Sequence, residues 1–247
     1  MVCRLVRIYA VHLDQMLDQE TFHQLSTYLS VERENRIRAL QNNLAAHRTL
    51  IGGLLARYVL SKKLQVASSD LCFYQNEYGK PLLKSSRPLH FNLSYSGEWV
   101  VCSISSTSVG VAIEKMNPID YAKAKRFFTP DEYEELLNKE EIERLAYYYR
   151  LWCLKESYLK ATGKGLYHSM DAFCITPSIR SGQYEVENGK QTFYVKEYAL
   201  DPAYKLAVCA KNKGFAEQIK QMQASILVRN FMAASESHTT PFSPKLI

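Results

Sequence analysis

Residues 140–165 read EEIERLAYYYRLWCLKESYLKATGKG, and this stretch organises the second half of the chain. Apolar side chains recur through it at helical spacing, which predicts a long helix from about Glu140 to Thr162. Gly163 and Gly165 then mark the end of the helix. The apolar face of the helix is formed by Leu145, Tyr148, Tyr149, Trp152 and Leu159.

Glu156 falls within this apolar face, between Trp152 and Leu159. An ionised carboxylate that faces a core is costly unless a cation or hydrogen-bond donors meet it. Two interpretations follow: a buried ion pair with a nearby Lys or Arg, or a metal ligand or general base. Lys155 and Lys160 lie on neighbouring faces, either as plain surface lysines or as contacts for phosphate oxygens beside a metal.

A second acidic element is Gly110-Val-Ala-Ile-Glu114. In a strand, residues 112 and 114 point to one face and residues 111 and 113 to the other. Carboxylates at both 112 and 114, with one more from a helix, would form an all-oxygen site suited to Mg²⁺. Only Glu114 is present here, and a lone glutamate at the end of a strand is also compatible with a solvated side chain.

The two halves of the chain show the same order of elements, helices followed by short strands, without a sequence repeat. In the first half we expect a strand around Leu5–His12, helices near Gln19–Tyr28 and Ala45–Lys63, and strands at 72–75, 81–84, 90–96 and 99–105. Ser30 fits the N-cap of a short helix between those two helices. In the second half we expect strands near 172–176, 192–199 and 204–210. The pattern predicts an α+β fold of two similar, pseudo-twofold subdomains, each with helices packed on a small antiparallel sheet.

The predicted boundaries divide the chain into residues 1–106, 107–215 and 216–247. The first two are the subdomains, and a ligand cleft is expected between them. The third is expected to form a helix from Ala216 to Phe231, followed by a disordered tail, because Ser235–Lys245 is rich in Ser, Thr and Pro.

Composition narrows the class of protein. Hydrophobic residues make up 47% and charged residues 23% of the 247 residues, as in ordinary soluble globular proteins. No apolar run approaches the roughly 20 residues that span a bilayer, and MVCRLVRIYAVHLD predicts an opening strand, not a signal peptide. None of the six cysteines forms a C-x-x-C pair, which favours free thiols over a disulfide framework or zinc site and indicates a cytoplasmic protein.

The formal net charge of +6 suits a polyanionic ligand or an acidic protein partner. It is too small to imply nucleic acid, since the chain has no block of five or more Lys and Arg residues.

Taken together, the motifs resemble those of 4′-phosphopantetheinyl transferases of the large, surfactin-synthetase-activating type. That family has a G-[IV]-D-[IV]-E segment followed about forty residues later by W-x-x-K-E-x-x-x-K, which here are residues 110–114 and 152–160. The second motif matches throughout. Similar segments occur in order over about residues 5–215: His47-Arg48-Thr49, Tyr78-Gly79-Lys80-Pro81, His90-Phe91-Asn92-Leu93-Ser94 and residues 122–128.

The resemblance implies that coenzyme A donates its 4′-phosphopantetheine arm to a serine of an apo peptidyl or acyl carrier protein, releasing 3′,5′-ADP in a Mg²⁺-dependent reaction. It implies that Glu114 and Glu156 are metal ligands, that Glu156 also takes the serine proton, and that Lys160 contacts the pyrophosphate. Lys155 is carried over as a further contact to coenzyme A. By the same resemblance the protein acts as a monomer. Its charge pattern and the lack of a long apolar run argue against nucleic-acid and membrane partners.

The nucleotide end of coenzyme A is expected to meet Arg33, Arg36, Thr49, Ser94 and Tyr95, with Tyr78, Gly79 and Lys80 at its border. Lysines are common in the family where this chain has Arg33 and Arg36, and the guanidinium fork suits phosphate equally well. A solvated helix face is the alternative for both. Tyr95 stands where the surfactin-type enzyme has a histidine, so it supplies a hydroxyl but no positive charge.

Ala112 is the main departure, because the family has an aspartate there and a methyl group cannot bind Mg²⁺. Losing partners of metal ligands alone costs roughly 10–100-fold in affinity or activity. We therefore expect a weakened or inactive enzyme. A single replacement in an otherwise intact site indicates a disarming change and not gradual drift.

Two other functions compete with an authentic transferase. A non-catalytic protein of the same fold would bind coenzyme A or a carrier protein without turnover, and a basic nucleic-acid-binding module would bind with steep salt dependence. The carrier is expected to dock around Met116–Thr129. Lys123, Lys125 and Arg126 lie there beside four residues that could offer apolar contacts, Ile119, Tyr121, Phe127 and Phe128, unless both Phe side chains pack in the core.

Overall fold

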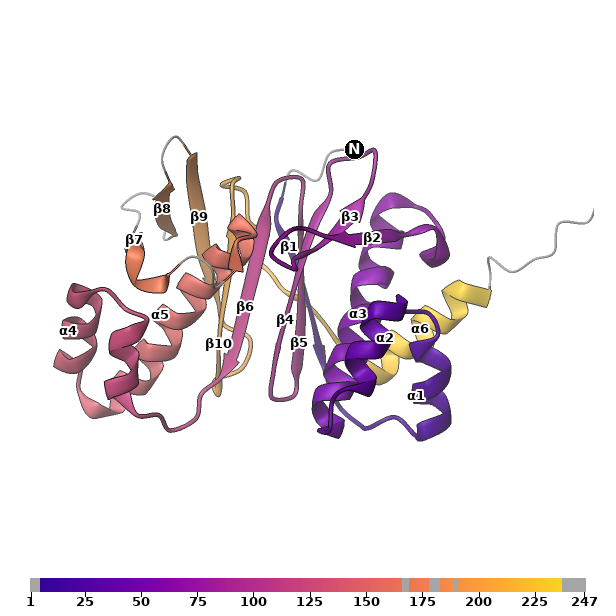
Figure 1. Ribbon diagram of the computed structural model, residues 1–247, viewed down its shortest axis with the longest axis horizontal. Helices are drawn as coiled ribbons and strands as arrows, with labels where there is room; N and C mark the ends of the chain where they lie inside the picture. Colours follow the sequence, from indigo (N-terminus) through magenta and orange to yellow (C-terminus); the bar gives the residue numbers. More distant parts are fainter. Residues whose placement is uncertain (1–4, 166–168, 178–182, 189–190, 237–247) are drawn as a thin grey trace, which may run out of the picture.

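A computed structural model describes residues 5–165, 169–177, 183–188 and 191–236. Two β-sheets pack face to face, and each is covered on its outer face by helices, so that four layers follow one another across the molecule (Figure 1). The α+β class predicted from the sequence is confirmed. None of the helices within these ranges combines the length and apolar character that crossing a membrane requires.

The first sheet has the strand order β11-β1-β5-β4. Strand β1 (Arg7–His12) pairs antiparallel with β5 (Trp99–Ser105), which pairs antiparallel with β4 (His90–Ser96). Strand β11 (Lys220–Gln223) runs parallel to β1, with Tyr9 opposite Lys220. This sheet is therefore not purely antiparallel, which corrects that part of the prediction.

Four helices belong to the layer outside this sheet: α1 (Gln19–Ser26), α2 (Val31–Arg38), α3 (Asn43–Leu64) and α6 (Ala224–Glu236). Helix α2 begins after Ser30, whose hydroxyl accepts a hydrogen bond from Arg33 N, as the sequence predicted. A small hairpin, β2 (Cys72–Gln75) and β3 (Pro81–Lys84), lies beside them, and Gly79 in its turn has φ 79°. A 3₁₀ turn, Ser68–Asp70, precedes β2.

The second sheet has the order β6-β10-β9-β8-β7. Its strands are β6 (Val109–Lys115), β7 (Thr176–Pro177), β8 (Tyr184–Asn188), β9 (Gln191–Tyr198) and β10 (Tyr204–Ala210). Helix α5 (Glu141–Thr162) lies on its outer face with α4 (Pro130–Asn138) beyond (Figure 1). Short 3₁₀ turns occur at Tyr121–Arg126 and Met170–Ala172.

The two halves share one plan. In each, a long helix covers a sheet in which an early strand pairs with the second strand of a later hairpin: β1-β5-β4 in one half and β6-β10-β9 in the other. This repeated order is the pseudo-twofold arrangement expected from the sequence.

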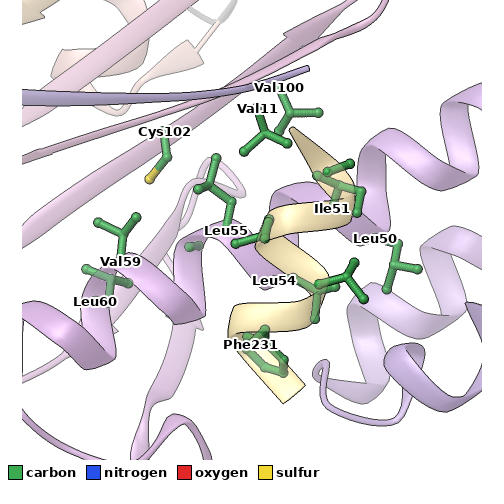
Figure 2. Close-up of a cluster of buried hydrophobic side chains, with 14 of the residues drawn as sticks. Val11, Leu50, Ile51, Leu54, Leu55, Val59, Leu60, Val100, Cys102 and Phe231 are labelled. Atoms are coloured by element: carbon green, nitrogen blue, oxygen red, sulfur yellow. The ribbon is translucent and has the colours of Figure 1, made fainter. Parts of the chain in front are cut away.

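Three apolar clusters hold the layers together. In the first, α3 and α6 cover the outer face of the first sheet, with Leu54, Leu55 and Phe231 among its buried side chains (Figure 2). The second lies between the sheets and joins residues such as Ile8 and Val101 to Val111 and Ile113. The third lies between α5 and the second sheet and includes Ala112. Burial of this kind supplies most of the folding free energy.

Two predicted elements are wrong. The segment expected to form one helix from Ala216 to Phe231 first forms β11 and only then α6, because strand pairing with β1 is available to residues 220–223. The strand predicted at 172–176 reduces to a 3₁₀ turn followed by the short β7. Ser235 lies in α6, and the tail predicted over the remainder of Ser235–Lys245 falls outside the described residues from 237 onward.

Candidate active site

The edges of the two sheets are joined by side chains of β4. Asn92 Oδ1 accepts from Val111 N at 2.9 Å, Ser94 Oγ from Ile113 N at 3.2 Å, and Ser96 Oγ from Lys115 N at 3.1 Å. Alternate residues of a strand share one face, so three polar residues spaced by two can satisfy the donors along one edge of β6. We call this row of hydrogen bonds between β4 and β6 the seam. It brings the end of β6 next to the end of β4.

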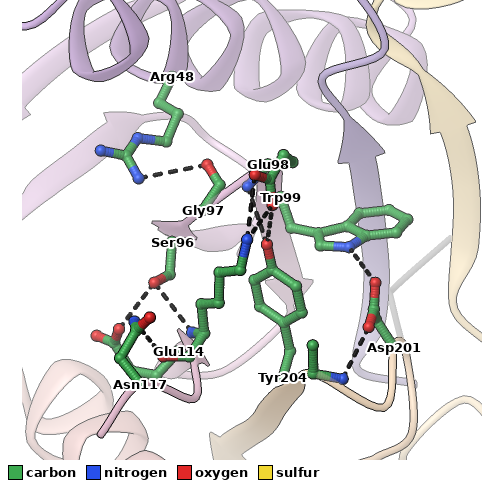
Figure 3. A network of polar contacts seen from close by, with 11 residues as sticks. Arg48, Ser96, Gly97, Glu98, Trp99, Glu114, Asn117, Asp201 and Tyr204 are labelled. Atoms are coloured by element: carbon green, nitrogen blue, oxygen red, sulfur yellow. Dashed lines mark hydrogen bonds and ion pairs between the residues drawn. The ribbon is translucent and has the colours of Figure 1, made fainter.

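Two carboxylates meet at this seam. Glu114 lies at the end of β6 and accepts a hydrogen bond from Ser96 Oγ at 2.9 Å (Figure 3). Burial raises the pKa of Glu114; the Ser96 bond opposes that rise, and the charge of Glu156 adds to it. Lys160 and Arg48 lower the same pKa. Glu156 is thus close enough to Glu114 for its negative charge to raise the pKa of Glu114.

Lys160 links the carboxylates to the seam. Its Nζ lies 3.1 Å from Glu156 Oε1 and donates to Ser94 Oγ at 3.0 Å. The other oxygen, Glu156 Oε2, is buried and has no hydrogen-bond partner among the described residues. An unpaired, buried carboxylate oxygen is costly, and a cation would relieve that cost.

Ala112 lies on the same face of β6 as Glu114, fully buried beneath α5 in the cluster that includes Cys153 and Ala207. Within the described part of the chain, no group of three or more His, Cys, Asp and Glu side chains could hold a metal ion. Glu114 and Glu156 still fit Mg²⁺, because this ion commonly binds one or two carboxylates and completes its shell with water and substrate phosphates.

The position of α5 depends on Gly110 in β6. A Cβ atom there would lie 2.1 Å from Ser157 O and 2.4 Å from Ala161 N. The helix backbone therefore rests directly on the strand, and this close approach sets Glu156 and Lys160 over the seam.

A pocket of about 210 Å³ lies between α2, α3 and the β2–β3 hairpin. Three residues predicted from the sequence line it: Arg33, Arg36 and Gly79. Burial lowers the pKa of Arg33, whose Nε donates to Thr49 O at 3.1 Å. Arg36 Nη2 donates to Tyr95 Oη at 3.2 Å, so Tyr95 is joined to this cationic wall.

Three predicted residues are held elsewhere. Lys155 is fully buried, and its Nζ contacts Met170 O at 2.8 Å, Phe173 O at 2.6 Å and Glu132 Oε2 at 2.7 Å. These contacts use all three donors of the ammonium group, so Lys155 is neither a surface lysine nor grouped with the site.

Lys80 Nζ similarly donates to Val109 O at 3.0 Å and Lys160 O at 2.6 Å, and burial lowers its pKa to about 8. Thr49 is buried, with its hydroxyl donating to Ala45 O at 2.8 Å. Tyr78 belongs to the same turn as Gly79 and is 38% exposed. Of the predicted coenzyme A contacts, Lys80, Thr49 and Lys155 thus have other partners.

Sequence reasoning assigned no role to Arg48, although it lies in one of the quoted segments. Its guanidinium stands 6.0 Å from the centre of the Tyr95 ring and donates to Gly97 O at 3.3 Å. Its buried Nε has no partner among the described residues. The helical position next to Thr49 carried no signal that this side chain would reach the seam.

Paired carboxylates with an adjacent lysine, beside an arginine-lined pocket, are typical of an enzyme that acts on a phosphate-bearing substrate at a metal ion. Comparison with known proteins identifies the family. Residues 108–209 match the 4′-phosphopantetheinyl transferase superfamily, and residues 17–107 match the family described as 4′-phosphopantetheinyl transferase, N-terminal.

The chain is 40% identical over 216 residues to 4′-phosphopantetheinyl transferase Sfp of Bacillus subtilis, covering 87% of this chain and 96% of that protein. It is 38% identical to 4′-phosphopantetheinyl transferase ffp of Bacillus subtilis, covering 90% and 100%. It is 32% identical to 4′-phosphopantetheinyl transferase gsp of Aneurinibacillus migulanus, covering 96% and 100%. The chain belongs to the 4′-phosphopantetheinyl transferase superfamily, so the enzyme class predicted from its motifs is confirmed.

Proposed function

We propose that this chain transfers the 4′-phosphopantetheine arm of coenzyme A to a serine of an apo peptidyl or acyl carrier protein, with the chemistry at Glu114, Glu156 and Lys160. A bond forms between the serine oxygen and the β-phosphorus of coenzyme A. The bond from that phosphorus to the bridging oxygen breaks, and 3′,5′-ADP leaves. The observation that carries this proposal is the pairing of Glu114 and Glu156 beside Lys160 at the seam.

Glu156 is the base in this proposal. Its unpartnered Oε2 can accept the serine proton, while Lys160 Nζ, 3.1 Å from Oε1, holds the carboxylate in place. Such proton transfer contributes typically 10²–10⁴-fold to a rate. Lys160 also supplies positive charge to the pyrophosphate, since Ser94 and Glu156 keep its ammonium at the seam.

Glu114 and Glu156 would hold Mg²⁺, which when bound would offset the charge that grows on the leaving 3′,5′-ADP. Ser96 keeps one oxygen of Glu114 hydrogen-bonded, at 2.9 Å, so this carboxylate has a defined orientation. The mutual repulsion of two partly buried carboxylates favours binding of a cation at this place.

The nucleotide end of coenzyme A fits the pocket lined by Arg33 and Arg36, with Arg48 and Tyr95 at its seam side. Guanidinium groups bind phosphate through paired, charge-assisted hydrogen bonds. The pocket therefore accounts for a 3′-phosphate without needing Lys80, Thr49 or Lys155.

Carrier docking is proposed at Met116–Thr129, on charge. Lys123, Lys125 and Arg126 are exposed there and suit an acidic partner. Phe128, by contrast, is buried in a cluster with Leu136 and Leu151, and Phe127 packs edge-to-face on Trp152. Ile119, Tyr121 and Phe127 are partly exposed and remain as the apolar part of the proposed surface, whereas Phe128 does not.

A monomeric, cytoplasmic protein is part of the same proposal. Cys72, Cys102, Cys153, Cys174 and Cys209 are all free thiols, as in a reducing compartment.

Ala112 weakens the metal site in this proposal, because a buried methyl group occupies a place on the ligand-bearing face of β6. We test this by mass spectrometry of an apo carrier protein incubated with coenzyme A, Mg²⁺ and either the chain itself or Ala112→Asp. We expect Ala112→Asp to modify the carrier at least about 10–100-fold faster.

The control is Glu156→Gln placed in the Ala112→Asp background, which keeps the size of the side chain and removes the base. It should abolish most of the gain. Absence of modification with both the chain and Ala112→Asp, across several carrier proteins, would overturn the proposed activity. Equal rates for the two would show that Glu114 and Glu156 suffice.

A further inference from the structure

The turn between β4 and β5 connects the two halves of the molecule at the seam. Ser96, the last residue of β4, and the turn residues Gly97 and Glu98 together form what we call the 96–98 turn. Their partners come from both halves (Figure 3). Leu13 N, from the first half, donates to Glu98 O at 2.8 Å. The side chain of Glu98 instead points to the second half.

Tyr204 and Lys115, both from the second sheet, bind Glu98 through hydrogen bonds and an ion pair. They face each other across β10 and β6. Lys115 Nζ lies 3.2 Å and 3.0 Å from Glu98 Oε1 and Oε2. The Tyr204 hydroxyl donates to Glu98 Oε2 and accepts from Glu98 N at 3.0 Å. A tyrosine that meets both the backbone and the side chain of one residue fixes that residue firmly.

Gly97 allows Tyr204 and Lys115 to come close enough to bind Glu98. It has φ 52°, and a Cβ atom at this position would lie 2.1 Å from the Tyr204 hydroxyl oxygen and 2.9 Å from Lys115 Cδ. Glycine is thus required both by the backbone conformation and by the contact. The turn and Tyr204 pack as one unit.

The same turn controls two groups of the candidate active site. Ser96 Oγ donates to Glu114 Oε2 at 2.9 Å and accepts from Lys115 N at 3.1 Å. Gly97 O accepts from Arg48 Nη1 at 3.3 Å. A shift of the turn would therefore move the hydroxyl that orients Glu114.

We propose that Tyr204 is a positioning residue, which through Glu98 holds the 96–98 turn so that Ser96 orients Glu114 for a divalent cation. With Ala112 opposite Ala207, Glu114 is the one carboxylate that β6 supplies, so its orientation matters more here than in a site with two. The inference rests on the proposed function, specifically on its metal site.

The test uses the full chain and Mn²⁺, whose binding in the presence of saturating coenzyme A is followed by electron paramagnetic resonance. Tyr204→Phe removes only the hydroxyl, Ser96→Ala removes the orienting donor, and Ser96→Thr retains it. Tyr198→Phe is the matched control, because the hydroxyl of this tyrosine donates to Ala216 O at 2.6 Å and not to the turn. Coenzyme A affinity with EDTA and thermal unfolding are measured in parallel.

Ser96→Ala and Tyr204→Phe should each weaken Mn²⁺ binding by roughly tenfold, while coenzyme A affinity without metal stays unchanged. Ser96→Thr and Tyr198→Phe should bind Mn²⁺ as the original chain does. The inference is wrong if Ser96→Ala and Tyr204→Phe leave Mn²⁺ binding unaffected. It is also wrong if Tyr198→Phe weakens Mn²⁺ binding as much as Tyr204→Phe does. If the original chain itself binds no Mn²⁺ with coenzyme A, the proposed metal site fails, which is a distinct result.

Discussion

Helices α3 and α5 occupy equivalent places in the two halves, but they bury different kinds of side chain. Each has 22 residues and lies on the outer face of its sheet. The buried side chains of α3 are apolar except for His47 and Thr49. Helix α5 buries Lys155 completely and holds Glu156 and Lys160 over the seam.

The difference also appears where each helix meets its neighbours. Gly52 and Gly53 of α3 leave room for the side chain of Arg33 from α2, with Arg33 Nη2 3.3 Å from the Cβ position at Gly52. Under α5 the glycine belongs instead to the strand, where Gly110 admits the helix backbone itself. The two halves repeat one fold but use it differently. In the first half α3 helps to line a pocket, and in the second half α5 carries the charged groups of the candidate site.

The largest change in stability is expected from the buried ion pair of α5. Lys155→Met should lower the free energy of unfolding by roughly 3–5 kcal/mol, because it leaves the Glu132 carboxylate, 11% exposed, without its cation. Urea denaturation measures the effect.

The matched variant is Lys155→Met combined with Glu132→Leu, which removes both charges. It should recover part of the loss; the remaining cost comes from the unpaired Met170 and Phe173 carbonyls and from the lost hydrogen bond of Thr129 N to Glu132 at the start of α4. A single variant as stable as the original chain would contradict a structural role for the pair. In α3 no lysine is held in this way among the residues described.

A smaller but still large effect is expected at the close approach of α5. Gly110→Ala should destabilise the protein by roughly 3 kcal/mol, because the added methyl meets backbone atoms of α5 that cannot turn away. The same substitution in α3, Gly52→Ala, meets the movable end of Arg33 and should stay within about 1 kcal/mol of the original. If urea denaturation showed similar losses in the free energy of unfolding for Gly110→Ala and Gly52→Ala, the proposed difference between the two halves would be wrong.

The smallest effect is expected in the pocket of the first half. Arg36→Ala should weaken coenzyme A binding by roughly tenfold, the value of a charge-assisted hydrogen bond, and leave stability nearly unchanged. Isothermal titration calorimetry measures the affinity. Arg38→Ala is the control on the same helix, since Arg38 is 67% exposed and pairs with Glu34. Equal losses for the two would indicate a general charge effect and would argue against the pocket.

Most helices and strands could be predicted from the sequence, since local pattern determines them. The 90–96 and 99–105 strands and the helix of Ser30 were predicted with correct bounds or caps. The parallel strand β11 could not be, because residues 220–223 become a strand only by pairing with β1, more than 200 residues away in the chain.

The candidate site divides in the same way. Helical and strand periodicity placed Glu156 within an apolar helix face and Glu114 on the same strand face as Ala112, with a buried ion pair and a solvated side chain left open as alternatives. The missing carboxylate at position 112 followed only from the resemblance to the family. Family membership, too, was present in the order of the motifs.

Only the tertiary structure decided which charges face the seam. Lys155 and Lys160 are five residues apart on one helix, yet the first is sealed between Glu132 and two carbonyl groups and the second reaches Ser94. Arg48, Ser96 and Tyr204 gain their places in the same way, through strands and helices far apart in the chain. Side-chain direction follows from the local backbone, but its partner depends on what the rest of the fold places there.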